Sequence, residues 1–153
     1  MTQLLERSYS DPDAALTDLR TSVQSAWTEV DASSSVRLPP PRTRHYLQLV
    51  IHEWVANLVR HATFSSSPQL IVRIEIRQET VCCEILDNSD GFDPEATLHT
   101  LQEKAHPLPE AHMGLRIIDA CSSRMSYKPN EAEQQRFTVS IPYDHDPWMN
   151  VLF

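Results

Sequence analysis

Glycine is scarce in this chain, which has 2 glycines among 153 residues. Typical usage near 7% would give about ten. The scarcity excludes collagen-like tracts, glycine-rich repeats and flexible linkers, and any phosphate-binding loop has to be unusually poor in glycine. The length suits a single domain over residues 1–153, large enough to bury roughly two-thirds of the surface of its unfolded chain.

Clustered positive charge, long apolar runs and a cysteine framework are also missing. The net charge is −8 and the pI is about 5.3, so we expect no direct nucleic-acid partner. No apolar run approaches the roughly 18 residues of a membrane span, and the first residues lack a signal-peptide core, so we expect no membrane association. Cys82 and Cys83 are adjacent and the third cysteine stands alone, which argues against a disulfide framework. These features predict a soluble, reduced, cytoplasmic protein.

The hydrophobic pattern predicts alternating helices and strands. Apolar residues at steps of three and four, such as Leu16 and Leu19, indicate a helix from about Pro12 to about Val30. A second helix over 43–63 is apolar around more than half of its circumference, so we expect it deep in the fold. Strands are predicted over 3–9, 70–77, 80–86, 124–128 and 136–141, and further helices over 94–101 and 113–122. This order predicts an α+β fold with helices on one face of a mostly antiparallel sheet.

Residues 53–61 form the most informative segment of the sequence. Glu53, Asn57 and His61 follow one another at steps of four on the second helix, so they form one polar stripe on an otherwise apolar surface. One interpretation is the solvated face of an amphipathic helix. The other is a functional stripe, in which a carboxylate, an amide and an imidazole accept a proton, bind a metal and contact phosphate.

Two further segments contain the glycines. Residues 87–94, Asp-Asn-Ser-Asp-Gly-Phe-Asp-Pro, directly follow a predicted strand; by themselves they read as a tight turn, and their spacing does not fit a calcium loop. Residues 112–118 place Gly114 at the start of a predicted helix. Free N–H groups at such a start favour phosphate, although ordinary helix capping explains a single glycine equally well.

In this order, the three segments resemble the sequence boxes of the GHKL ATPase superfamily, and within it those of the small anti-sigma-factor serine kinases. Residues 53–61 look like the N box, 87–94 like the first glycine box and 112–118 like the second. The resemblance implies the histidine-kinase-like ATPase (Bergerat) fold, a two-layer sandwich of helices on a mixed, mainly antiparallel sheet, with ATP between the layers. No dimerisation and phosphoacceptor helix pair precedes the boxes, which disfavours a complete sensor histidine kinase.

The same resemblance implies roles for single residues. Glu53 is the expected general base that accepts the proton of a serine hydroxyl, and Asn57 is the expected Mg²⁺ ligand. Asp87 is expected to accept a hydrogen bond from the adenine amino group, and residues 92–113 to form a lid over the phosphates. The other implied nucleotide contacts are His61, Gly91, Phe92, His112, Met113, Gly114 and Leu115. Among them, Gly91 lets the backbone approach the nucleotide and Gly114 presents helix N–H groups to the phosphates.

The implied function is an ATP- and Mg²⁺-dependent serine/threonine protein kinase that acts as an anti-sigma factor in a partner-switching system. Such a protein binds a sigma factor or a related regulator and phosphorylates a serine of a STAS-type anti-anti-sigma protein. Homodimers are common in the family that the sequence resembles. Two alternatives stay open: a non-catalytic partner-switching module with weak or no ATP binding, and a detached ATP-binding domain of a phosphorelay kinase.

Several residues depart from the family pattern and motivate the non-catalytic alternative. Ser89 and His112 stand where the two boxes usually have their first glycines, so we expect crowding of the adenine pocket and a stiffer lid hinge. Ser123 replaces a frequent aspartate, and Arg136 stands where a glycine often precedes the last strand.

Two other features have less specific interpretations. His99, His106 and His112 lie in the expected lid, with Cys82 and Cys83 on a nearby predicted strand, but these spacings match no common zinc site. The apolar residues 147–153 fit docking on their own domain, or a contact with a partner or a second copy.

Overall fold

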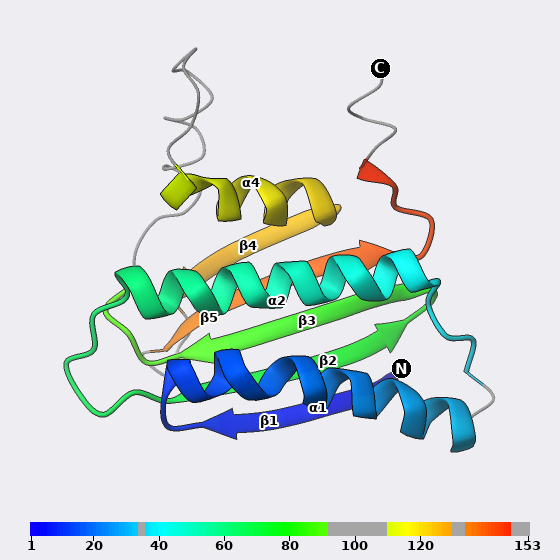
Figure 1. Ribbon diagram of the computed structural model, residues 1–153, viewed down its shortest axis with the longest axis horizontal. Helices are drawn as coiled ribbons and strands as arrows, with labels where there is room; N and C mark the ends of the chain where they lie inside the picture. The colour runs from blue at the N-terminus through cyan, green and yellow to red at the C-terminus, as the bar shows by residue number, and fades with distance from the viewer. Residues whose placement is uncertain (34–35, 92–109, 130–133, 148–153) are drawn as a thin grey trace, which may run out of the picture.

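A computed structural model describes residues 1–33, 36–91, 110–129 and 134–147. The helices are α1 (Pro12–Ser33), α2 (Pro41–His61) and α4 (Glu110–Cys121). The strands are β1 (Thr2–Tyr9), β2 (Leu70–Arg77), β3 (Thr80–Asp87), β4 (Arg124–Pro129) and β5 (Gln135–Pro142). Figure 1 shows the helices as one layer lying across one face of the sheet. This is the two-layer α+β sandwich that the sequence predicts.

The five-stranded sheet has the order β1-β2-β3-β5-β4, and every pairing between these strands is antiparallel. The β2–β3 hairpin turns at Gln78 and Glu79, both with positive φ. Alternate residues of β2, from Leu70 to Ile76, are buried, as expected for a sheet covered on one face. The alternation therefore fixes which side of each strand faces the helices.

The core lies between the helices and the sheet, and Trp54 of α2 is at its centre. The Trp54 side chain is fully buried and stacks on Phe137 of β5, with ring centroids 4.0 Å apart and planes 5° apart. It also meets the ring of Tyr127 of β4 edge-on, with centroids 4.7 Å apart. Aromatic pairs of this kind stabilise by about 0.5–1.5 kcal/mol beyond the area that they bury. They fix α2 above β4 and β5.

The opposite face of the sheet carries a ladder of ion pairs across four strands. Arg73 of β2 pairs with Glu6 of β1 at 3.1 Å and with Glu84 of β3 at 2.9 Å, and Arg136 of β5 pairs with Glu84 at 2.6 Å. Arg136, which the family pattern places before the last strand, lies within β5 and ends this ladder. Half-exposed pairs contribute little each, but the ladder keeps this face polar.

Most predicted elements are confirmed within a few residues. Asp11 caps α1, because its Oδ1 accepts a hydrogen bond from the Asp13 N–H at 3.0 Å. The long α2 begins and ends two residues earlier than predicted, with a proline in its first turn. The helix predicted over 94–101 lies outside the described residues. The cysteines are free, as expected, and within the described ranges no helix is long and apolar enough to cross a membrane.

Candidate functional site

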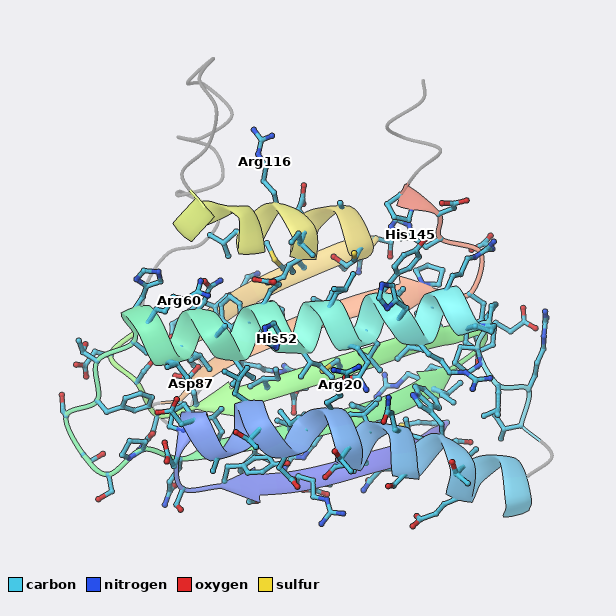
Figure 2. The ribbon with its side chains drawn as sticks, viewed as in Figure 1. Arg20, His52, Arg60, Asp87, Arg116 and His145 are labelled. Carbon is cyan, nitrogen blue, oxygen red and sulfur yellow. The ribbon has the colours of Figure 1, made fainter. Side chains whose placement is uncertain are left out.

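Three elements bring the predicted site residues to one end of the domain. The C-terminal end of α2, the end of β3 and the beginning of α4 lie at the same side of Figure 1. Figure 2 places Arg60 of α2 and Asp87 of β3 at that end. The segments that directly follow α2 and β3 are joined by a backbone hydrogen bond, in which the Asp90 N–H donates to the Thr63 carbonyl at 2.8 Å. The fold therefore assembles segments that are far apart in the sequence.

The polar stripe of α2 passes from solvent into the interior. His61 is exposed and Glu53 is half-buried. Asn57 is 2% exposed, and among the residues that the structure describes its Nδ2 has no hydrogen-bond partner. A buried amide nitrogen without a partner costs about 1–3 kcal/mol. The interpretation as a solvated helix face is therefore wrong at Asn57, although it still describes His61.

Gly114 of α4 lies directly against Glu53. A Cβ atom built on Gly114 would lie 2.5 Å from Glu53 Oε2, closer than real Cβ contacts come. The helix begins at Glu110, three residues before the predicted start, so Gly114 is its fifth residue. Because only the first four N–H groups of a helix lack an acceptor within it, Gly114 is past the free ones. In this structure its small size lets the Glu53 carboxylate fit between α2 and α4.

Asp87 ends β3 and is completely buried. Its Oδ1 accepts hydrogen bonds from the Ser89 N–H at 2.9 Å and from the Ser89 hydroxyl, and its Oδ2 accepts from the Tyr127 hydroxyl at 3.3 Å. Burial raises the pKa of the Asp87 carboxyl above its usual range, while the hydrogen bonds from Ser89 oppose that rise. Asp87 is thus a fixed acceptor at the end of a strand.

The Ser89 side chain connects Asp87 to the turn that follows it. Its hydroxyl donates to Asp87 and accepts from the Gly91 N–H at 3.2 Å. Gly91 has φ +85°, a conformation that L side chains rarely adopt, and a Cβ there would meet the Gln135 side chain at 2.9 Å. Ser89 therefore stiffens the turn where the family usually has a glycine.

The loop after α2 holds the turn after β3 in place. Asp90 accepts hydrogen bonds from the hydroxyls of Thr63 at 3.0 Å and Ser65 at 2.7 Å. Asn88 accepts from the Gln69 N–H at 2.7 Å, and its Nδ2 donates to the carbonyl of Ser67, 2.8 Å away. These bonds fix the position of residues 87–91 relative to the end of α2.

A comparison with family models matches residues 13–141 to the model described as "Histidine kinase-like ATPase domain". This chain belongs to that family. Among solved structures, it is similar to the catalytic domain of histidine kinase ThkA, in a nucleotide-free form, with 10% sequence identity and a TM-score of 0.48. That match covers 91% of this chain and 97% of the other. A search of curated proteins gives no match.

The other residues predicted to contact the nucleotide do not lie together in this ATPase domain as far as the structure describes them. Leu115 is 5% exposed and belongs to the core beneath α4. His112 and Met113 lie within α4, but their side chains, like Phe92 and most of the predicted lid, lie outside what the structure describes. In the described part of the chain, no cluster of His, Cys, Asp and Glu could hold a metal ion, and the His99 and His106 of the zinc hypothesis lie outside that part.

Sequence reasoning missed the residues that support the site of this ATPase domain. Tyr127 joins the central Trp54 to Asp87, because its ring meets Trp54 and its hydroxyl donates to Asp87. Tyr127 lies on β4, 40 positions after Asp87, and no local motif marks it. Only its place on the buried side of a predicted strand could have indicated an inward-facing ring.

The polar side chains at this end of the domain are suited to binding a hard cation and a nucleotide. Asn57 offers its amide oxygen as a cation ligand, and its Nδ2, which has no partner within the described residues, can donate to an acceptor such as a phosphate oxygen. The Glu53 carboxylate lies one helical turn before it. Mg²⁺ prefers a small number of protein oxygens supplemented by phosphate and water, and Asp87 supplies a buried acceptor.

Proposed function

We propose that this domain is a Mg²⁺-ATP-dependent serine/threonine protein kinase of the anti-sigma type, which phosphorylates a STAS-type protein and binds a sigma factor or a related regulator. The observation that carries the proposal is Asn57, which is buried on α2 one turn from Glu53, with an amide nitrogen that has no partner in the part of the chain that the structure describes. Membership of the histidine kinase-like ATPase family supports the nucleotide part. The cytoplasmic location, the partners and a homodimer remain predictions from the sequence.

In this proposal each residue has a separate task. The Asn57 amide oxygen holds the cation, which supplies charge neutralisation for the phosphates. Asp87 accepts a hydrogen bond from the amino group of the adenine, and its buried, fixed position favours one orientation of the nucleotide. Glu53 accepts the proton of the substrate serine while the serine oxygen bonds to the γ-phosphorus and ADP leaves with the electron pair of the broken bond.

One observation favours a second function, a partner-switching module without catalysis. Asp87 already accepts three hydrogen bonds within the protein, two of them from Ser89. An amino group of a bound base has to compete with the Ser89 hydroxyl. If it loses that competition, the domain acts by protein binding alone.

The two functions are distinguished by incubating the protein with γ-labelled Mg²⁺-ATP and a small STAS-type protein. We expect acid-stable label on a serine of the STAS-type protein. Glu53→Gln keeps the shape of the side chain but removes the base, so we expect it to bind ATP normally and to transfer phosphate at least about 100-fold more slowly. Glu75→Gln, on the open face of the sheet, is the matched control and keeps the wild-type rate.

The outcomes separate the hypotheses. Phosphate transfer by Glu53→Gln at the wild-type rate would show that Glu53 is not the general base. No binding of Mg²⁺-ATP at millimolar concentration contradicts the kinase proposal and supports the non-catalytic module. Acid-labile label on a separate phosphoacceptor-histidine protein, with none on the STAS-type protein, supports the detached phosphorelay domain.

A further inference from the structure

A groove between α1 and α2 runs along the outer side of the helical layer. Its volume is about 680 Å³, within the usual range of ligand-binding pockets. Figure 2 shows Arg20 of α1 and His52 of α2 between the two helices, on the side away from the sheet. The groove is lined by residues of α1 from Leu16 to Thr28, by Leu38 and by residues of α2 from Pro41 to Val55. Asp87 and Gly114 are not among them, so the groove is separate from the nucleotide site.

The charged and titratable side chains of the groove are basic. It is lined by Arg20, Arg44, His45 and His52, and by no aspartate or glutamate among the described residues. Within the described residues, none of these four forms an ion pair. The chain as a whole has 21 acidic and 13 basic residues. The described lining of the groove thus carries arginines but no carboxylate in an acidic chain, and its charge complements an acidic ligand.

The groove also exposes apolar surface along its length. Leu16, Leu38 and Leu49 are only partly buried. Trp27 is 5% exposed, and its indole Nε1 has no hydrogen-bond partner among the described residues, while the Arg44 guanidinium lies 5.9 Å from the centre of the Trp27 ring. Gln48 ties the two helices together, donating from Nε2 to the Arg20 carbonyl at 3.2 Å. The site therefore combines a fixed apolar floor with a basic rim.

We propose that this groove binds an acidic amphipathic helix of a partner protein. The lining residues of α1 extend from Leu16 to Thr28, which at 1.5 Å per residue is about 18 Å, the length of about three helical turns. A helix lying there places apolar side chains at i, i+3, i+4 and i+7 on the floor and its carboxylates against Arg20 and His52. Binding does not require nucleotide, so the proposal is independent of the proposed kinase activity.

The test uses a synthetic 18-residue peptide with leucines at helical spacing and glutamates elsewhere, and a counterpart in which lysines replace the glutamates. Calorimetry with the full chain should show binding of the acidic peptide, weakening as salt is added, and none of the basic peptide. Arg20→Glu should weaken binding about tenfold or more, because an attractive pair becomes repulsive. Arg124→Glu, an exposed arginine of β4, is the matched control and leaves binding unchanged.

Other outcomes overturn the proposal. Equal binding of both peptides, or equal affinity of Arg20→Glu and wild type, shows that the basic rim does not select the ligand. Sedimentation of the protein alone measures its oligomeric state, and so tests whether a second copy of this chain occupies the groove. A dimer that Arg20→Glu dissociates assigns the groove to a second copy of this chain.

Discussion

Asn57 is a buried polar side chain whose amide nitrogen has no partner within residues 1–33, 36–91, 110–129 and 134–147. Natural domains contain few such groups, and a catalytic role or a bound ion is one of the explanations for them. The spacing of Glu53, Asn57 and His61 could be found from the sequence, because helical geometry puts them on one stripe. Their different exposure could not, because it depends on how α4 covers the middle of α2.

Ser89 is the departure from the family pattern with the clearest structural consequence. Its hydroxyl donates to Asp87 and so occupies an acceptor that a base amino group would use. We predict that Ser89→Gly binds Mg²⁺-ATP about 3- to 10-fold more tightly, the value of one net hydrogen bond. Calorimetry of the variant and wild type measures the difference. Weaker binding by Ser89→Gly would show that the hydroxyl supports the nucleotide site.

At the scale of elements, the contact between α2 and α4 positions the candidate base. The sequence pattern predicts that this helix starts at Met113, with Gly114 opening it, whereas α4 begins at Glu110. Glu110 and Ala111 extend α4 by a turn, and both are good helix formers. The result is a glycine inside a helix, where its packing against Glu53 matters more than its backbone freedom.

Gly114→Ala tests this packing. The new Cβ would lie 2.5 Å from Glu53 Oε2, so the carboxylate has to move by about 1 Å to reach an ordinary contact distance. Because the displaced atom ends a flexible side chain, we expect the variant to be as stable as wild type or up to about 1 kcal/mol more stable. Phosphotransfer should fall about 100-fold, as catalysis tolerates little displacement.

Chemical denaturation and single-turnover transfer measure both quantities on the same preparation. A variant that is more stable and equally active would show that the contact does not position Glu53. A variant that loses several kcal/mol would show that α4 itself is displaced.

At the scale of the whole molecule, strand alternation predicted much of the sheet but not its order. The pattern of β2 and β3 gave the hairpin and its buried face, because residues at steps of two share one side. The position of β5 between β3 and β4 was not predictable. It depends on Trp54 stacking on Phe137 and on Tyr127 reaching Asp87, contacts between segments far apart in the chain.

The central claim is that the end of the domain formed by α2, β3 and α4 is a Mg²⁺-nucleotide site. Titration calorimetry of Mg²⁺-ATP against wild type and Asn57→Ala, with unfolding free energies measured in parallel, tests it most directly. We predict that Asn57→Ala binds Mg²⁺-ATP about 100-fold more weakly or not at all, since even the loss of an outer-shell partner costs 10–100-fold in metal affinity. Its unfolding free energy should change by less than about 1 kcal/mol, because the small cavity is offset by removal of an unpartnered amide. Equal affinity of the two proteins, at equal stability, would contradict the account.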